Sequence, residues 1–346
     1  MKILHLLASD RFSGAENVVC QIIGMMKDEP DTEMIYCSRD GQIREALAER
    51  EIAFAPISDV SVSEVKRVIK EYQPDVIHAH DMRASFVAAR ACGKITLISH
   101  IHNNAFDSRG LSIKSIAYLL AARKAKHIFW VSQSAYKGYC FYNFFAKKSE
   151  VLYNIIDIDT LYKKMEADTN TYDFDISYVG RLSYPKNPER LMNVLKKVTE
   201  KKPDVKVAII GTGELEKETK ELWRELSLEN NVYFLGFQSN PLKILHDSKV
   251  MIMTSRWEGT PMCALEAMAL GVPIVSTPVD GLKVLIENGK NGYLEDDDDI
   301  LAERIVEIIS DSELHGNMSK YTAEKAKVIN DTNAYKAQLK KQYKLN

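Results

Sequence analysis

Short apolar runs that alternate with helical patterns restrict the fold of this chain more than any other feature of its sequence. Six strand-like runs lie in the first half, at residues 3–8, 33–37, 76–80, 95–100, 128–131 and 150–153. Five more lie in the second half, at residues 176–179, 205–210, 232–235, 250–254 and 274–276. Helical patterns separate most of them, which is typical of βαβ units with a parallel sheet. Because 346 residues exceed the usual size of a single core, the repeat predicts two doubly wound, Rossmann-like α/β domains.

A polar, weakly patterned segment, "DIDTLYKKMEADTNTYDF", lies between the two halves. Its composition predicts a linker near residues 160–174, and therefore one domain over residues 1–163 and another over residues 164–330. The remaining residues, 331–346, have a helical pattern that could pack on either domain, and we expect it to pack back on the first. The acidic run "EDDDD" at residues 295–299 precedes another helical pattern and is expected to cap that helix.

The charge distribution is uneven along the chain. The formal net charge is −2, which argues against a general nucleic-acid-binding protein. Positive charge is nevertheless concentrated over residues 82–149, where eleven Lys and Arg residues accompany a single acid. Such a stretch is either a solvated face or a docking surface for an anionic partner, such as phosphate groups or a membrane.

The cysteines, the histidines and the N-terminal segment bear on compartment and metal binding. Five cysteines without a Cys-x-x-Cys pair indicate buried thiols in a reducing compartment. The histidines show no cluster at ligand spacing, so the sequence predicts no metal site. The apolar run in "MKILHLLASD" is too short for a signal peptide, and no run reaches the ~18 apolar residues that would cross a bilayer. We therefore expect a cytoplasmic protein, with peripheral contact to the inner face of a membrane left open.

Ligands of open α/β sheets bind beyond the carboxyl ends of the strands, so residues that follow strands are candidates for a site. In "SDRFSGAENVV", Gly14 opens a helix whose free N–H groups suit an anion, although ordinary turn formation explains one glycine equally well. In "SHIHNN", His100 and His102 can point to the same side. His102 lies further toward the loop and could hydrogen-bond a bound hydroxyl or accept charge at a reacting centre, unless it is a structural histidine.

The first loop of the second half, in "SYVGRLSYPKNPERLM", contains Arg181 and Lys186. A planar guanidinium and a compact ammonium five residues apart are suited to straddle a diphosphate, although lone surface cations are common. Farther on, "GTGELE" places Gly213 between a strand and a helix. This is a weak nucleotide signal, because the third glycine of the dinucleotide fingerprint is missing. With the usual strand order, this loop lies beside Arg181.

The segment "EGTPMCALEAM" predicts a helix start that faces a ligand. Thr260 can cap the helix and Pro261 fits its first position. The next N–H groups are then free for a phosphate or for sugar oxygens; they belong to Met262, Cys263 and Ala264. Glu258, before the cap, can reach the same ligand, and Glu266, about one turn into the helix, can accept two hydrogen bonds from a vicinal diol. Either glutamate could instead be a cap or a surface acid.

With these residues in view, the chain resembles the retaining nucleotide-sugar glycosyltransferases of the GT-B fold, in the large family typified by bacterial mannosyl-, glucosyl- and N-acetylhexosaminyltransferases. The resemblance covers nearly the whole chain. It rests on "SGAENVV", "DVIHAH", "VSQSAYKGY", "VLYNIIDIDTL", "VGRLSYPKNPERLM", "GTGELE" and "EGTPMCALEAMALGVPIVST". The last segment contains the E-x7-E arrangement of the family, from Glu258 to Glu266, and is highly specific.

The resemblance implies a role for each matching position. Arg181 and Lys186 would neutralise the donor diphosphate, Glu258 would lie at the donor sugar, and Glu266 would hold the ribose hydroxyls. His102 would contact the donor sugar near the reacting carbon. Further donor contacts, mostly through the backbone, would come from Gly14, Gly213, Phe237, Thr260, Pro261, Met262 and Cys263. Residues 1–163 would form the acceptor domain and residues 164–330 the donor domain.

The resemblance also implies the reaction. It would be a retaining, metal-independent hexosyl or N-acetylhexosaminyl transfer without a cofactor, from a nucleotide-diphosphate sugar, with a UDP-sugar favoured. The acceptor would be a saccharide or a lipid-linked saccharide in cell-surface polysaccharide or glycan synthesis. Two positions depart from the family pattern, since Ile155 and Ser13 stand where the family often has glycine. The alternatives are a nucleotide-sugar epimerase or hydrolase on the same fold, or a non-catalytic nucleotide-sugar-binding scaffold.

Overall fold

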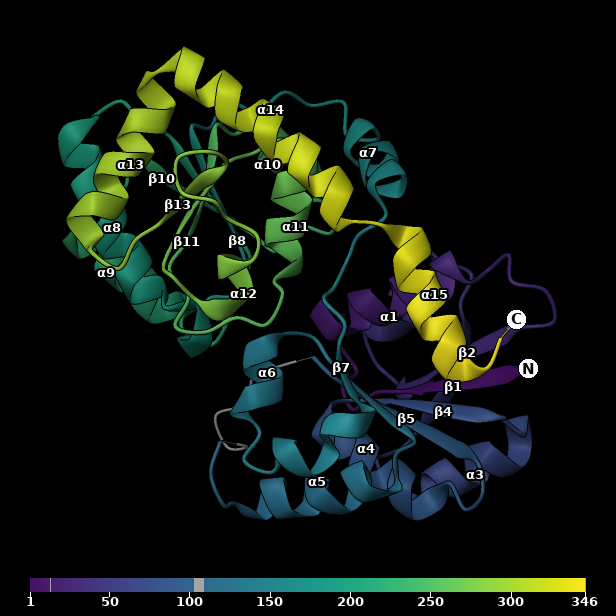
Figure 1. Ribbon diagram of the computed structural model, residues 1–346. Coiled ribbons are helices and arrows are strands. Elements are labelled where there is room, and N and C mark those ends of the chain that lie inside the picture. The colour runs from purple at the N-terminus through teal and green to yellow at the C-terminus, as the bar shows by residue number, and fades with distance from the viewer. Residues whose placement is uncertain (13, 103–108, 346) are drawn as a thin grey trace. The chain divides into compact units, whose positions relative to one another are not determined.

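The structure is a computed structural model that describes residues 1–12, 14–102 and 109–345 (Figure 1). The chain divides into two compact units. The first contains residues 1–155 and 332–346, and the second contains residues 156–331. The C-terminal segment is therefore part of the first unit.

The first unit is built on a seven-stranded parallel sheet in the order β3-β2-β1-β4-β5-β6-β7. Its strands are β1 (Lys2–Leu6), β2 (Glu33–Arg39), β3 (Ala53–Ile57), β4 (Val76–His80), β5 (Thr96–Ile101), β6 (His127–Trp130) and β7 (Ser149–Val151). Its α-helices are α1 (Gly14–Met25), α2 (Ile43–Ala48), α3 (Val62–Tyr72), α4 (Asp81–Ala91), α5 (Ile113–Lys124), α6 (Gln133–Gly138) and α15 (Thr332–Tyr343). A 3-10 helix, η2 (Tyr142–Lys148), precedes β7.

Helices cover both faces of this sheet. Helices α3, α4 and α5 lie on one face, and α1 and α15 lie on the other (Figure 1). On the first face, Leu4 and Leu6 of β1 belong to a buried apolar cluster with Val65 of α3 and Tyr118 of α5. On the second face, the fully buried Tyr343 of α15 contacts the central strands.

The second unit repeats this plan with a six-stranded parallel sheet in the order β10-β9-β8-β11-β12-β13. Its strands are β8 (Ile176–Val179), β9 (Val207–Ile210), β10 (Val232–Gly236), β11 (Val250–Met253), β12 (Ile274–Ser276) and β13 (Gly292–Leu294). Its α-helices are α7 (Ile158–Glu166), α8 (Pro188–Lys201), α9 (Glu216–Glu225), α10 (Leu242–Asp247), α11 (Met262–Ala269), α12 (Asp280–Lys283), α13 (Asp298–Ser310) and α14 (Ser312–Ile329). A 3-10 helix, η3 (Tyr184–Lys186), precedes α8.

The two doubly wound sheets confirm the predicted fold class, but two strands were not predicted. Strand β3 contains Pro56 and pairs only with β2, at the edge of its sheet, where a missing N–H group is tolerated. Strand β13 has three residues and lies at the edge of the other sheet. Runs this short or interrupted carry little periodic signal.

The predicted linker at residues 160–174 is wrong over its first part. Residues 158–166 form α7, whose N-terminus is capped by the Asp157 carboxylate, which accepts a hydrogen bond from the Thr160 N–H group at 3.1 Å. The helix packs within the second unit, where the Tyr162 hydroxyl donates to the Ala269 carbonyl at 3.0 Å. The division between the units accordingly lies at residues 155–156, eight residues before the expected boundary.

Candidate active site

The central candidate residues of the second unit lie where the winding of its sheet reverses. Arg181 and Lys186 follow β8, and Glu258 follows β11. Strands β8 and β11 are neighbours, and the chain runs outward from them in opposite directions across the sheet. Such a switch point is where open α/β sheets bind ligands, beyond the carboxyl ends of their strands. The fold thus brings together three side chains that are up to 77 positions apart in the sequence.

A largely buried ion pair joins the two loops at this point. The Lys186 ammonium donates to Glu258 Oε1 at 2.5 Å, and the Ser255 hydroxyl donates to the same oxygen at 2.6 Å. The Lys186 and Glu258 side chains are only 19% and 10% exposed. Burial by itself lowers the pKa of Lys186, but the nearby groups, Glu258 foremost, together outweigh burial, so the pKa lies above its usual value and the ammonium stays charged. An ammonium has three N–H groups, so two remain for a ligand.

Arg181 is an exposed cation beside this pair. Within the described ranges it makes no ion pair, whereas Tyr178, at the end of the preceding strand, donates its hydroxyl hydrogen to the Arg181 carbonyl at 3.0 Å. This contact fixes the backbone of the loop and leaves the guanidinium available. The loop therefore presents one buried and one exposed cation, a combination suited to bind a diphosphate.

Hydrogen bonds hold the two loops against each other. The Arg256 N–H group donates to the Pro185 carbonyl at 2.8 Å, and its guanidinium donates to Asn187 Oδ1, also at 2.8 Å. The Thr277 hydroxyl donates to the Ser255 carbonyl at 2.7 Å. The geometry of the buried ion pair is therefore fixed by its surroundings.

Gly281 is a positioning residue that the sequence interpretation missed. A Cβ atom at this position would lie 1.5 Å from the carbonyl oxygen of Gly259, so the start of α12 packs directly on the loop that carries Glu258. Only glycine allows this approach. The signal was present in "PVDGL", a glycine just after a strand, but its meaning depends on a contact 22 residues away.

The start of α11 differs from the prediction by one residue. Pro261, not Thr260, is the N-cap, with φ −71° and ψ 124°, and no side-chain cap is formed. The helix begins at Met262, and the Ala264 N–H group, expected to be free, donates to the Pro261 carbonyl at 3.1 Å. The N–H groups of Met262 and Cys263 still have no acceptor within the helix. Extended ψ at Pro261 shifts the cap, because the helix can begin only after that residue.

Glu266 lies inside α11, and its carboxyl is the most strongly perturbed acid of this region. Burial raises its pKa to about 7, against a smaller opposite effect of Lys164. Burial likewise raises the pKa of the neighbouring Cys263 thiol to about 12, so this sulfur is no nucleophile at neutral pH. Glu266 is thus poised between its two protonation states, and a ligand that donates two hydrogen bonds would select the carboxylate.

The "GTG" loop lies beside the Arg181 loop, as predicted. The Leu182 N–H group donates to the Thr212 carbonyl at 3.0 Å, and a Cβ atom at Gly213 would lie 2.2 Å from the Leu182 carbonyl oxygen. This close approach to the Leu182 backbone is sufficient to explain why a glycine stands at position 213. Phe237, which directly follows β10, is 69% exposed, which leaves its ring free to contact a base.

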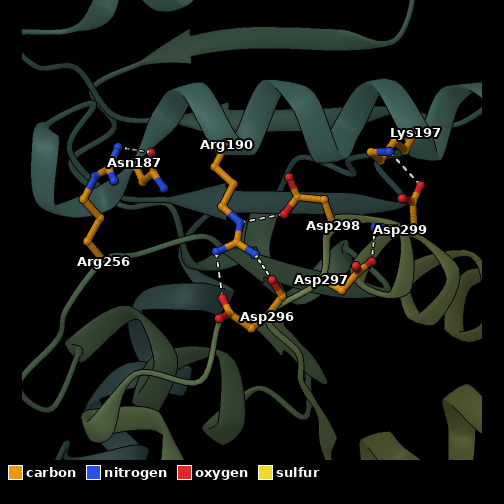
Figure 2. Close-up of a pocket in the computed structure, with 8 residues that line it drawn as sticks. All are labelled: Asn187, Arg190, Lys197, Arg256, Asp296, Asp297, Asp298 and Asp299. Carbon is orange, nitrogen blue, oxygen red and sulfur yellow. Dashed lines mark hydrogen bonds and ion pairs between the residues drawn. The ribbon is translucent and has the colours of Figure 1, made fainter.

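Two of the three cations that line a pocket beside these loops, Arg190 and Lys197, are already neutralised by acids. Its lining residues are Asn187, Arg190, Lys197, Arg256, Asp296, Asp297, Asp298 and Asp299. Figure 2 shows Arg190 held between Asp296 and Asp298, with its Nε atom 2.6 Å from Asp298 Oδ1, and Lys197 paired with Asp299. Asp297 caps α13, which confirms the predicted role of the acidic run. These ion pairs join α13 to α8 and support the loop before α8, where Lys186 lies.

In the first unit, Gly14 and His102 both follow strands. Gly14 is the first residue of α1, and a Cβ atom there would meet nothing within 4 Å. The adjacent Ser13 lies outside the described residues. His102 follows β5, and its backbone N–H group donates to Asp81 Oδ1 at 3.0 Å. Asp81 has the left-handed φ of 66°, an uncommon conformation for a residue other than glycine.

His102 belongs to a cluster that sequence reasoning missed. Five histidine rings lie together on the face of the sheet that α15 covers; they are His5, His78, His80, His100 and His102. The prediction of no histidine cluster at ligand spacing is therefore wrong. Ring nitrogens come within 4.8 Å of one another in two groups of three in the described part of the chain, namely His5, His78 and His80, and His80, His100 and His102. Parallel pairing places His5 opposite His78 and His80 opposite His100.

All five rings are neutral at physiological pH. Burial lowers the pKa of His5 and of His102 to about 3, and it lowers the pKa of His78, His80 and His100 well below the usual value. Neighbouring histidines add to this effect for the four other than His102. His102 is therefore neither a cation nor an effective proton acceptor in this environment.

Comparison with known families accounts for both units. Residues 163–325 match the family described as Glycosyl transferases group 1, and residues 12–160 match the one described as Glycosyltransferase Family 4. The chain is a glycosyltransferase of the GT-B fold. An uncharacterized glycosyltransferase of Methanocaldococcus jannaschii is 31% identical to this glycosyltransferase over 62% of the chain and 58% of its own length. The chain thus spans less than two thirds of that relative.

Other similar proteins match along nearly the whole glycosyltransferase. A UDP-Gal:alpha-D-GlcNAc-diphosphoundecaprenol alpha-1,3-galactosyltransferase of Escherichia coli is 24% identical over 87% of the chain and 85% of its own length. HepE of Anabaena, solved in complex with UDP-glucose, has a TM-score of 0.86 at 24% identity and covers 99% of both chains. Sucrose-phosphate synthase of Thermosynechococcus elongatus has a TM-score of 0.78 at 17% identity, with 99% and 98% covered. At these identities the solved structures show the shared fold.

Proposed function

We propose that this glycosyltransferase moves a hexosyl or N-acetylhexosaminyl group from a UDP-sugar to a saccharide or lipid-linked saccharide, with retention of configuration and without a metal ion. The observation that carries the proposal is the buried pair of Lys186 and Glu258 beside the exposed Arg181, at the switch point of the second sheet. A diphosphate needs the cations, and a sugar needs the carboxylate.

Within this pair, Glu258 would bind the sugar of the donor and Lys186 its diphosphate. Both hydrogen bonds to Glu258 fall on Oε1, and no residue in the described ranges bonds Oε2. This second oxygen is available to accept from sugar hydroxyls, while the two remaining N–H groups of Lys186 donate to phosphate oxygens. Glu266, deeper in α11, would accept from the ribose diol. The fold shared with HepE, which was solved in complex with UDP-glucose, supports a uridine donor.

The chemistry is a substitution at the anomeric carbon. The bond from that carbon to the diphosphate oxygen breaks, and a new bond to the acceptor hydroxyl oxygen forms on the same face of the sugar. The acceptor proton passes to the departing diphosphate, which leaves with the bonding electron pair. Arg181 and Lys186 stabilise the negative charge that grows on the diphosphate, the task that a metal ion performs in other enzymes. The protein then contributes positioning and charge stabilisation.

The acceptor assignment rests on relatives and on the surface of the first unit. The Escherichia coli relative is named for a diphosphoundecaprenol-linked acceptor. In the present chain, large apolar side chains are exposed on and around α5 and η2, namely Leu111, Ile113, Ile116, Leu120 and Phe144. Basic residues share these segments, and cations among exposed apolar groups suit an anionic lipid surface. We therefore propose peripheral membrane binding at the cytoplasmic face. In the part of the chain that the structure describes, every helix is too short or too polar to cross a bilayer.

The donor assignment is tested with nucleotide sugars. A thermal-shift panel of UDP- and GDP-sugars identifies the donor, and product analysis with a lipid-linked acceptor gives the anomeric configuration. Arg181→Gln and Lys186→Gln are each expected to lower turnover by about 10²–10³-fold, because each removes charge stabilisation from the transition state. Lys197→Gln is the matched control, since this lysine pairs with Asp299 on the same unit. Full turnover in the Arg181 and Lys186 variants would refute the assignment.

The membrane assignment is tested by co-sedimentation with liposomes. Ile113→Ser combined with Phe144→Ser is expected to weaken binding to vesicles that contain anionic lipid. Val328→Ser is the matched control, because Val328 is a comparably exposed apolar residue on α14. Equal binding to neutral and anionic vesicles would argue for a merely solvated basic surface.

A further inference from the structure

Arg256 is the one cation of the pocket in Figure 2 without an acid as its partner among the described residues. The four acids that line this pocket are engaged elsewhere: two bond Arg190, one bonds Lys197, and one caps α13. The Arg256 guanidinium instead donates to a neutral amide oxygen, Asn187 Oδ1, at 2.8 Å (Figure 2). Arg256 therefore joins the two loops of the site without neutralising a charge.

Asn187 departs from the usual behaviour of a residue at its position. It is the N-cap of α8, and an asparagine there normally accepts a hydrogen bond from an N–H group of the first helical turn. That cap bond is absent, and the amide oxygen bonds Arg256 instead. The backbone of Asn187 is also left-handed, with φ 55° and ψ 57°, a conformation that few residues other than glycine and asparagine adopt. The side chain thus serves the contact between the loops and not the helix.

Arg256 holds the turn that contains Lys186 at three points. Its backbone N–H group donates to the Pro185 carbonyl at 2.8 Å, directly before Lys186. Its guanidinium bonds Asn187, directly after Lys186, and the guanidinium carbon lies 4.5 Å from the centre of the Tyr184 ring. All the other residues of this four-residue turn therefore contact Arg256.

The backbone of Lys186 is fixed from the same loop. The Thr254 hydroxyl lies 3.3 Å from the Lys186 carbonyl oxygen and 3.1 Å from that of Asn187, and it donates toward both. Thr254 and Arg256 together anchor the turn from which the Lys186 ammonium reaches Glu258. A misplacement of about 1 Å in a group that acts on the reacting atoms can lower turnover ~10²-fold, so this anchoring affects what Lys186 can do.

We propose that Arg256 is a positioning residue that holds the Lys186 ammonium at the phosphate oxygens of the donor, and that it acts through Lys186 and not by its own contact with the donor. The proposal rests on the proposed function, in which Lys186 binds the donor diphosphate. The Arg256 guanidinium is already engaged by Tyr184 and Asn187. Arg181, which makes no ion pair within the described ranges, remains the second cation for the diphosphate.

Calorimetry of the full chain with UDP and with uridine isolates the contribution of the diphosphate. Arg256→Ala should bind UDP about tenfold more weakly than the wild type, the loss of one charge-assisted hydrogen bond, and should bind uridine equally well. Arg304→Ala is the matched control on the same unit and should leave UDP binding unchanged. The Arg304 guanidinium carbon lies 4.6 Å from the centre of the Tyr293 ring, and the guanidinium bonds Glu307 at 2.9 Å.

A second variant tests the same contact from its other side. Asn187→Gly keeps the left-handed backbone but removes the acceptor of the Arg256 guanidinium. It should weaken UDP binding to a similar extent, and it keeps the proposal testable if Arg256→Ala does not fold. Unchanged UDP binding in the folded variants, or uridine binding weakened as much as UDP binding, overturns the proposal.

A double-mutant cycle shows whether Arg256 acts through Lys186. In the Lys186→Gln background, Arg256→Ala should change UDP affinity and turnover by less than about twofold, because the cation that it positions is already gone. Losses that add would indicate a direct contact of Arg256 with the donor and refute the positioning role alone. If Lys186→Gln by itself leaves UDP affinity and turnover unchanged, the proposed function fails and this proposal fails with it.

Discussion

Acidification from pH 7.5 to pH 5.5 should destabilise the first unit through its buried histidines. In the unfolded chain each histidine has a pKa near 6.5 and takes up most of a proton over this interval. In the folded chain the pKa of His5 and His102 is about 3, and the pKa of His78, His80 and His100 is also far below 6.5, so none is protonated. The unfolded state therefore binds more protons, and stability falls as the pH falls.

The expected loss is large. Integrated over these two pH units, each histidine contributes about 1.4 kcal/mol, and the five together about 7 kcal/mol. Glu266 acts in the opposite sense in the second unit, because its raised pKa of about 7 lets the folded state bind a proton first. Glu64 and Glu287, with pKa values lowered to about 2, lose their contribution only below their unfolded pKa of about 4.5, outside this range. A loss of 7 kcal/mol is comparable to the whole stability of many domains.

Urea unfolding at both pH values measures this loss. Trp130 is a buried probe in the first unit, and replacing Trp223 and Trp257 by Phe removes the tryptophans of the second unit from the signal. His100→Phe removes one titrating ring of similar shape, so its pH-dependent loss should be smaller by about 1.4 kcal/mol. Equal free energies of unfolding at pH 7.5 and pH 5.5, or an unchanged pH dependence in His100→Phe, would refute the reasoning.

Three further predictions concern the second unit. Gly281→Ala should displace the Glu258 loop and sharply reduce donor binding in a thermal-shift titration. Gly316→Ala, whose Cβ meets nothing within 4 Å, should leave donor binding intact. Equal donor binding by the two variants would argue against the close packing at Gly281. UDP should bind about 25-fold more weakly at pH 5.5 than at pH 7.5 by calorimetry, because Glu266 with a pKa of about 7 must ionise to accept two hydrogen bonds. A Glu266→Gln variant with the same pH profile would contradict this. Lys186→Met should lower the free energy of unfolding in urea by about 3–5 kcal/mol, because it leaves a buried carboxylate unpaired. The double variant with Glu258→Gln should lose clearly less. Additive losses would show that the pair is not coupled.

Much of the candidate site in the second unit followed from local sequence. Arg181, Lys186 and Glu258 stood out because each follows an apolar run that is long enough to be a central strand. The ion pair between Lys186 and Glu258 did not follow, since it joins residues 72 positions apart. The order of β8 and β11 in the sheet creates that contact. The cap of α11 was misplaced by one residue, because the sequence does not contain the ψ of Pro261.

The first unit shows the same limit more strongly. A period of two predicted that His100 and His102 share a side of their strand, and the same spacing separates His78 and His80. Nothing local predicted that His5 joins them, because the pairing of β1 with β4 brings together residues more than 70 positions apart. The α15 helix then buries this face through Tyr343, whose hydroxyl lies 2.6 Å from His78 Nδ1.

The sequence by itself determined the alternation of strands and helices, the duplication of the sheet, and the loops in which ligand-binding residues lie. These features depend on periodicity and on turn chemistry within about 20 residues, which neighbouring side chains encode directly. The tertiary structure alone decided which loops meet, which charges are buried, and that five histidines share one neutral interior. Strand order and register make those contacts, and burial among them sets the protonation of the groups that they enclose.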